Sequence, residues 1–340
     1  MRRARTARPP QRWERLDDDA LLKLRFCDLR LRIGHSVVHA DVQRVLAELE
    51  RRGIGFRPHF WFSTEWFSPD GVPGIAVPFF LAHPRLVALE RRMLGEAEGS
   101  TRPWRLRLLR HEVGHAVDTA FGLRRRADWR RVFGSASAPY ARDYTVQPRS
   151  RDHVLHLEHW YAQSHPTEDF AETFAVWLRP KARWRADYTG WPALAKLEFV
   201  DRLMTELAGH PPTTRDRSVV APLTDNRRTL REHYRRRATF SDGVPRYDEW
   251  LVRVFTPDPA GRSAEQLLTE LKPRLMRALL AHSRVHPYTV HQVLRGVRRR
   301  ARHLALGFTG PKRELVPRVI RLHERILTDF LRRNEETYFL

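Results

Sequence analysis

Along the first two thirds of the chain, apolar residues alternate between a helical spacing and a period of two. Helical spacing predicts five amphipathic helices, in residues 36–53, 83–95, 101–122, 165–180 and 191–210. Between the first two, residues 59–66 and 73–80 alternate with a period of two and predict strands joined by the turn SPDGVPG. Pro78 has no amide hydrogen to donate, so the second strand is expected at a sheet edge. The pattern therefore predicts an α+β fold.

After residue 210 the chain becomes polar, basic and rich in proline. This composition predicts a linker or arm at residues 211–248. Helical spacing then resumes and predicts three further helices, in residues 262–285, 287–307 and 311–333. We therefore expect four parts: a basic tail at 1–19, an α+β domain at 20–210, the linker at 211–248 and a mainly α-helical C-terminal domain at 249–340.

The composition is that of a globular protein, with 340 residues of which 41% are hydrophobic. The single cysteine, Cys27, excludes a disulfide framework and a cysteine zinc cluster, and it fits a reducing compartment. The N-terminal sequence lacks the apolar run of a signal peptide, and no apolar stretch is long enough to span a membrane. We therefore expect a cytoplasmic protein with no membrane partner.

Basic residues outnumber acidic ones, 62 to 40, which gives a net charge of +22. Such a charge attracts nucleic acid, anionic lipid or acidic partners. The arginines are spread along the chain, a distribution that is typical of solvated helix faces. We expect only weak, non-specific nucleic-acid binding, and no pattern indicates an oligomeric state.

Two histidines and a glutamate interrupt the apolar face of the helix predicted at 101–122. They form the motif H-E-x-x-H, with His111, Glu112 and His115. Helix positions four apart share a face, so both imidazoles can reach one zinc ion. Glu112 lies beside that face, where a carboxylate can act as general base for a zinc-activated water that attacks a carbonyl. Gly114 would let another backbone approach closely. The motif predicts one Zn²⁺ per chain.

A catalytic zinc site needs a third protein ligand and an open position for water. Glu168 and Glu172 lie four residues apart on the helix predicted at 165–180, with Ala171 and Ala175 on the same side. These small residues predict close packing against the H-E-x-x-H helix, where carboxylates need partners. If one carboxylate is a zinc ligand and the other accepts a hydrogen bond from a ligating histidine, both carboxylates have partners.

Together, HEVGHAVD and EDFAETF resemble the gluzincin metallopeptidases, in particular the clade of the anthrax lethal factor catalytic domain and the Pro-Pro endopeptidases. They are also similar to a group of uncharacterised bacterial zinc-binding metallopeptidases. The resemblance implies a zincin-like domain with a small mixed sheet and an edge strand. It implies Glu168 as the zinc ligand, Glu172 as its support, and Tyr161 as the residue that stabilises the oxyanion. The implied activity is hydrolysis of peptide bonds, as an endopeptidase acting on a peptide or protein.

Several alternatives stay open at the site. Asp118 follows His115 by three residues, so it is a second candidate ligand, or a supporting residue that bonds within the site or pairs with an arginine. Four histidines offer a third imidazole instead, as in the SprT-like DNA-associated proteases: His153, His156, His159 and His165. Tyr140 and Tyr144 compete with Tyr161 for the oxyanion role.

Two further expectations concern function. A substrate backbone is expected to add as a strand along residues 74–80, and the alternative is that these residues form an ordinary edge strand. The alternative of a different class is a basic, nucleic-acid-associated protein whose zinc site is structural or vestigial. A structural site closes with four protein ligands, whereas a catalytic one keeps a position open.

Overall fold

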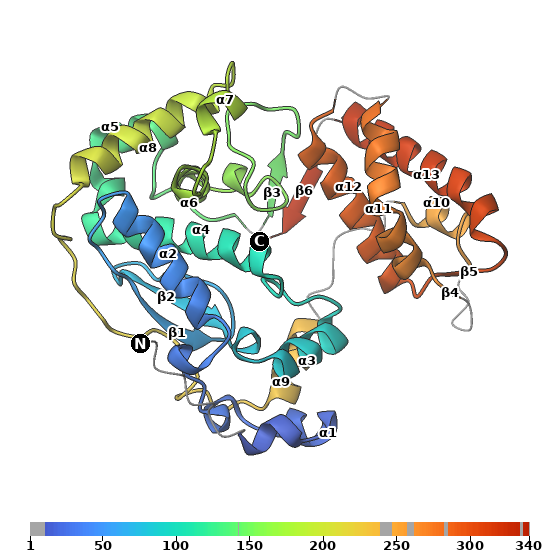
Figure 1. The fold of residues 1–340 in the computed structure, drawn as a ribbon, viewed down its shortest axis with the longest axis horizontal. Coiled ribbons are helices and arrows are strands. Elements are labelled where there is room, and N and C mark those ends of the chain that lie inside the picture. The colour runs from blue at the N-terminus through green and yellow to red at the C-terminus, as the bar shows by residue number, and fades with distance from the viewer. Residues whose placement is uncertain are drawn as a thin grey trace, which may run out of the picture. The chain divides into compact units, whose positions relative to one another are not determined.

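The computed structural model describes residues 11–141, 143–238, 247–256, 262–281, 285–333 and 336–339, and it divides into two compact units (Figure 1). Unit 1 comprises Met1–Pro139, Arg151–Leu157 and Tyr161–Ser241. Unit 2 comprises Tyr140–Ser150, Glu158–Trp160 and Asp242–Leu340. The described part of the chain contains no helix that is long and apolar enough to cross a membrane.

Unit 1 is built mainly of helices around one pair of strands. Its helices are α1 (Asp18–Leu22), α2 (His39–Arg51), α3 (Pro84–Leu94), α4 (Arg102–Phe121), α5 (Ala127–Phe133), α6 (Pro166–Leu178), α7 (Trp184–Asp187), α8 (Ala193–Leu207) and α9 (Leu230–Ala238). Its strands are β1 (His59–Ser63) and β2 (Gly74–Pro78). The five helices predicted from apolar spacing correspond to α2, α3, α4, α6 and α8, and the mixture of helices with small sheets is compatible with an α+β class.

The two strands pair in parallel, from His59 opposite Gly74 to Ser63 opposite Pro78. A simple turn cannot join parallel strands, so the intervening residues cross back beside β2. There Phe67 forms an antiparallel bridge with Ala76, whose amide donates to the Phe67 carbonyl at 2.8 Å. In this two-stranded sheet β2 lies at an edge, as Pro78 predicted, and the single bridge from Phe67 covers that edge only at Ala76.

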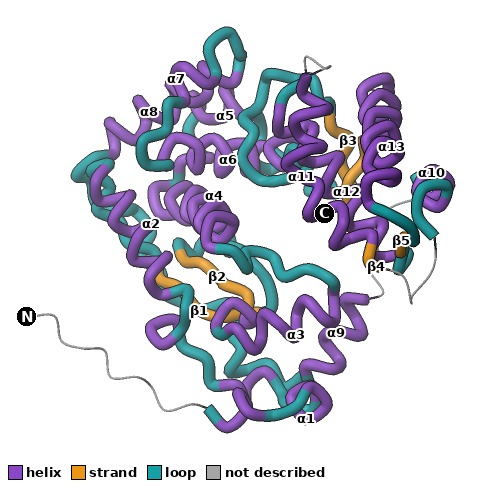
Figure 2. The backbone as a smooth tube through the Cα atoms, turned by 45° about the vertical axis from the view of Figure 1, so that its right-hand side comes forward, coloured by secondary structure: helices purple, strands orange, loops and turns teal. Residues whose placement is uncertain are grey.

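Helix α4 runs through the middle of unit 1, with α6 on one side and β2 and α2 on the other (Figures 1 and 2). It ends at Gly122, which has a φ of 63° and so adopts the left-handed conformation that stops a helix. A Cβ atom added to Gly114 would lie 2.9 Å from the Cα of Ala171 on α6. The expected close approach at Gly114 is confirmed.

Two buried ion-pair groups attach α4 to α2. Asp41 accepts hydrogen bonds from Arg102 and Arg105, each at 2.7 Å. Glu48, buried on α2, accepts a bidentate pair from Arg110 at 2.7 and 3.0 Å. Paired, hydrogen-bonded charges of this kind are costly to separate, so they fix the rotation of α4 about its axis.

Residues expected to form a linker belong partly to the core of unit 1. Leu230 and Tyr234 of α9 are buried there, and the Tyr234 hydroxyl donates to Glu90 of α3 at 2.8 Å. Burial raises the pKa of Glu90 to about 7, against a smaller opposing effect of that hydrogen bond. The predicted linker continues to residue 248, and residues 239–246 lie outside the described residues.

Unit 2 contains the three helices predicted for the C-terminal region, together with short elements. Its helices are α10 (Asp248–Val252), α11 (Ala264–Ala281), α12 (Pro287–His303) and α13 (Lys312–Arg333). Strands β4 (Arg262–Ser263) and β5 (Gly307–Phe308) pair with each other, and β3 (Asp143–Val146) pairs with β6 (Glu336–Phe339). Unit 2 thus takes a strand from the segment between α4 and α6, which the sequence assigned to the first domain.

Candidate metal centre

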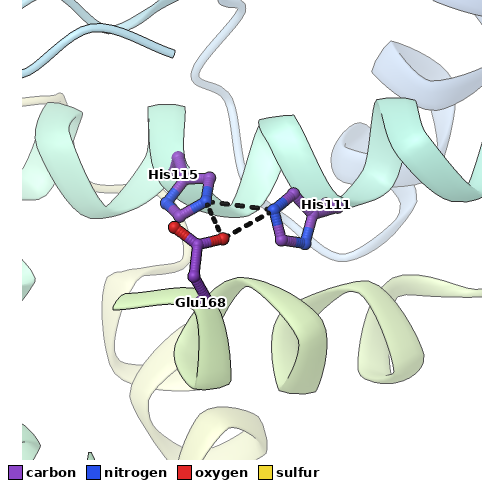
Figure 3. Close-up of side chains that lie close together, drawn as sticks. All are labelled: His111, His115 and Glu168. Carbon is purple, nitrogen blue, oxygen red and sulfur yellow. Dashed lines mark hydrogen bonds and ion pairs between the residues drawn. The ribbon is translucent and has the colours of Figure 1, made fainter. Parts of the chain in front are cut away.

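The H-E-x-x-H motif lies in the middle of α4 and faces α6. His111 and His115 occupy successive turns, and their Nε2 atoms are 3.1 Å apart (Figure 3). His111 is buried, with 3% of its surface exposed, and packs edge-on against His115. Two imidazoles at this depth need partners for both ring nitrogens, because burying an unpaired polar group is unfavourable.

The third group of the cluster comes from the first turn of α6. One carboxylate oxygen of Glu168, Oε2, lies 3.1 Å from Nε2 of His111 and 3.1 Å from Nε2 of His115 (Figure 3). The three atoms therefore form a nearly equilateral triangle. Among the described residues, these three side chains are the ones whose donor atoms meet closely enough to hold a metal ion.

The triangle fits the donor set of a zinc site. Zinc binds imidazole nitrogen and carboxylate oxygen at roughly 2.0–2.2 Å with tetrahedral geometry, which separates neighbouring ligand atoms by about 3.3 Å. The observed separations of 3.1 Å are close to that value. A site with three protein donors leaves one tetrahedral position for water or substrate, which is the arrangement of catalytic zinc centres.

Glu172, one turn after Glu168 on α6, orients His111 from behind. Its Oε1 accepts a hydrogen bond from Nδ1 of His111 at 2.8 Å, which leaves Nε2 of that ring as one corner of the triangle. Its other oxygen accepts from the amide of Leu157 at 2.7 Å. Glu172 is fully buried, so both oxygens are satisfied by these bonds rather than by solvent.

Burial and neighbouring charges act in opposite directions on these groups. Burial opposes a charge on His111, but the hydrogen-bonded carboxylates of Glu168 and Glu172 outweigh it and raise the pKa of His111 well above its usual value. Burial also opposes ionisation of Glu168, yet His115 and His111 outweigh it and hold the pKa of Glu168 well below its usual value. Both shifts have the same cause, the attraction between carboxylate and histidine, and the carboxylates of Glu168 and Glu172 thereby favour a positive charge at this position.

Glu112 projects from the same turn of α4 as His111. The side chain is buried, and its Oε2 atom has no hydrogen-bond partner among the described residues. Burial raises the pKa of Glu112, and the nearby His111 and His115 offset part of that rise. A buried carboxyl oxygen without a partner is rare in folded proteins and marks a place where a further polar group belongs.

Tyr161 lies in a short 3₁₀ helix, Tyr161–Gln163, that immediately precedes α6. Its ring centroid is 5.6 Å from that of His111, with the planes inclined by 51°. The structure therefore places the Tyr161 ring beside His111 of the triangle. The competing tyrosines, Tyr140 and Tyr144, belong to unit 2, where the Tyr144 hydroxyl donates to the carbonyl of His159.

Asp118 is fully buried on α4, but it is not part of the triangle. It accepts hydrogen bonds from the backbone amide of Arg124 at 2.8 Å and from Nε of the same residue at 2.6 Å. Arg124 also donates to Asp70 at 2.6 Å. Of the roles that the sequence left open for Asp118, pairing with an arginine is the one that the structure contains.

The histidines considered as a third imidazole have other positions. His156 bonds through Nε2 to the carbonyl of Arg107, and burial lowers the pKa of His156 to about 4. His165 caps α6 by accepting from the amide of Thr167, and its Nε2 bonds to the carbonyl of Ala138. His153 lies 3.8 Å from Asp169, and His159 belongs to unit 2.

Residues 102–185 match the model of a protein family described as "Putative zinc-binding metallo-peptidase". The matched region runs from the start of α4 to α7 and contains the triangle, Glu112, Tyr161 and Glu172. No curated protein and no solved structure matches the chain at a significant level. The comparisons therefore associate this region with zinc peptidases without singling out the lethal factor or Pro-Pro endopeptidase clade.

One contributor to the site was not foreseen. The amide of Leu157, which binds Glu172, lies in a segment whose neighbouring amide at Leu155 donates to the hydroxyl of Tyr188 at 2.9 Å. A backbone amide has no side-chain signature, so sequence patterns do not reveal it. The histidine-rich composition of residues 151–159 was the only signal there, and it suggested ligands.

Proposed function

We propose that this protein is a zinc-dependent metallopeptidase that hydrolyses peptide bonds, with His111, His115 and Glu168 as the metal ligands. The observation that carries the proposal is the triangle of donor atoms, 3.1 Å on each side, beside a buried carboxylate. The match of residues 102–185 to a zinc-binding peptidase family supports the same conclusion.

The proposal assigns a separate task to each group of this chain. Zinc, when bound, supplies a Lewis acid that lowers the pKa of a water toward neutrality. Glu112 accepts the proton of the attacking water and later delivers it to the leaving amine. Its burial and its unpartnered Oε2 suit this task, since burial makes the carboxylate a stronger base and no competing bond holds it.

Tyr161 is the proposed donor to the oxyanion that forms as the peptide carbonyl becomes tetrahedral. Its ring packs against His111, so the side chain is already held at the metal site. A hydroxyl positioned in advance stabilises developing charge without reorganisation, which is commonly the largest electrostatic contribution in such reactions. Glu172 positions His111 and takes no part in proton transfer.

The proposed catalytic groups also suggest the class of substrate. A zinc centre with a general base and an oxyanion donor suits an amide bond, and we propose an endopeptidase. The alternative of a structural zinc site would need a fourth protein ligand, whereas three donors meet among the described residues.

The test compares wild type with Glu112→Gln in zinc content and in peptide cleavage. Because Glu112 is not a proposed ligand, the variant is expected to keep about one zinc per chain. Loss of general-base help is expected to lower cleavage by about 10²–10⁴-fold. A diverse peptide library read by mass spectrometry serves as substrate, since the cleavage sequence is unknown.

Two controls make the result interpretable. Glu198→Gln removes an exposed carboxylate on α8 and is expected to retain wild-type cleavage. Glu168→Ala is expected to lose zinc as well as activity. Equal cleavage by wild type and Glu112→Gln would refute the mechanism, and a wild-type protein that takes up no zinc would refute the metal site.

A further inference from the structure

An open surface cavity of unit 2 lies between α10 and α13, which are neighbours in both views of the chain (Figures 1 and 2). It is a cavity of about 260 Å³. Four arginines line it together with one tryptophan: Arg253, Arg318, Arg321, Arg325 and Trp250. None of these residues belongs to the candidate metal centre, so the inference is independent of the proposed function.

Three of the arginines come from one face of α13. Arg318, Arg321 and Arg325 are three and four residues apart, a spacing that stacks side chains on one side of a helix. At about 1.5 Å per residue, they extend over roughly 10 Å of the helix axis. Arg253 faces them from the residue after α10. The guanidinium groups therefore converge on the cavity from two elements.

The four guanidinium groups have no carboxylate partner within 4.0 Å among the described residues, whereas many other arginines of the chain do. Nearby positive charges repel one another, so this arrangement lowers the stability of the unit unless an anion is present. Guanidinium groups bind phosphate oxygens in bidentate geometry, which makes them the preferred side chains for phosphate recognition.

Two contacts hold the side chains of Arg325 and Arg318 in place before any ligand arrives. The guanidinium carbon of Arg325 lies 4.2 Å above the ring centroid of Trp250, which is a cation–π contact. Arg318 donates through Nη2 to the carbonyl of Arg253 at 2.8 Å. Side chains that are already ordered lose less entropy on binding, which favours a defined site over a diffuse charged surface.

The size of the cavity limits the ligand. Pockets for drug-sized molecules have volumes of about 300–1,000 Å³, so about 260 Å³ suits a compact group. The Trp250 ring contacts Arg325 and Tyr247, so it serves the arginine and a neighbouring ring rather than a nucleobase. We propose that this pocket binds a diphosphate group, either as inorganic pyrophosphate or as the diphosphate of a nucleotide.

The test is calorimetric titration of the full-length protein with pyrophosphate, with ADP and with a single-stranded oligonucleotide. Wild type is expected to bind one pyrophosphate per chain. Arg321→Gln removes an exposed arginine of the pocket, and it is expected to weaken binding about tenfold or more, as loss of charged hydrogen bonds does. Titrations are repeated on metal-free protein, because pyrophosphate also binds zinc.

The matched control is Arg313→Gln, which removes an exposed arginine from the same helix outside the pocket. It is expected to leave pyrophosphate affinity within about twofold of wild type, since screened surface charges contribute little. Binding of ADP at least as tight as pyrophosphate would assign a nucleotide as the source, and failure of ADP alone would assign the free anion. Equal weakening by both variants, no pyrophosphate binding, or binding of the oligonucleotide alone would overturn the proposal.

Discussion

Replacing Gly114 by alanine adds one methyl group at a close approach of α4 and α6, the two helices that carry the proposed metal ligands. The new Cβ atom would lie 2.9 Å from Cα of Ala171 and 3.2 Å from its carbonyl oxygen. Both neighbours are backbone atoms of α6, so no flexible side chain can move aside. The helices themselves have to separate.

The required movement follows from these distances. Carbon atoms in contact are best separated by about 3.5–4.0 Å, so α6 must move away by roughly 0.6 Å or more. Metal sites tolerate about 0.2 Å in their ligand distances. Because Glu168 moves with α6 while His111 and His115 stay on α4, we expect zinc affinity to fall by about 10- to 100-fold, as it does when ligand support is removed.

The loss of folding stability should be somewhat smaller than the loss of zinc-binding free energy, which is about 1.4–2.7 kcal/mol for a 10- to 100-fold change. Alanine improves helix propensity by about 0.5–1 kcal/mol, whereas overpacking costs about 1–3 kcal/mol. We therefore expect a net loss of about 1 kcal/mol, measured by urea denaturation of the metal-free protein. Zinc affinity is measured by competition with a chromogenic chelator.

The control is Gly296→Ala on α12, where an added Cβ meets no atom within 4 Å. This variant should gain about 0.5–1 kcal/mol and bind zinc like wild type. If Gly114→Ala also keeps wild-type zinc affinity, the reasoning from close helix packing to ligand geometry is refuted.

Two other predictions test features of unit 1. Arg110→Ala leaves the buried Glu48 without its bidentate partner and should lower the free energy of unfolding by about 3–5 kcal/mol. Arg44→Ala removes a half-exposed partner of the same carboxylate and should lower it by only about 0–1 kcal/mol. Similar losses for the two variants in denaturation experiments would contradict this reasoning. The pKa of Glu90 is raised from 4.5 to about 7 in the folded state. Between these pH values Glu90 therefore holds a proton in the folded protein but not in the unfolded chain, so the free energy of unfolding falls as the pH rises from 4.5 to 7. Glu90→Gln should remove this fall, worth about 3 kcal/mol, and identical urea midpoints for variant and wild type at pH 5 and pH 8 would count against it.

The cluster of His111, His115 and Glu168 could be predicted from the sequence because its residues combine two strong local signals. Helical spacing placed His111 and His115 on one face, and the small residue Ala171 beside Glu168 and Glu172 indicated a close helix partner. Local periodicity fixes which side chains share a face, and a pair of complementary faces then brings them together. The roles of His111, His115 and Glu168 as metal ligands remain predictions, as do the catalytic roles assigned to Glu112 and Tyr161.

Features that depend on pairing between distant segments were not predictable in the same way. The alternation in residues 59–66 and 73–80 identified strands, but the period is the same for parallel and antiparallel pairs. Residues 211–248 are polar on average, and that average concealed the few apolar positions, such as Leu230, that attach α9 to unit 1. Strand β3 is only four residues long, and its partner β6 lies far away in the sequence.

The pairing of β3 with β6 has a consequence for the chain while it is being synthesised. Residues 143–146 leave the ribosome about 190 residues before their partner, residues 336–339. At about 5–20 residues per second, the delay is roughly 10–40 s, and Glu168, the last of the proposed metal ligands, is made early in it. For most of that time the proposed metal ligands have been made while β3 still has unpaired backbone groups, and such strand edges promote association with other chains. Premature termination of translation would make this state permanent, so truncated chains should be selective substrates for chaperones and degradation while still able to bind zinc.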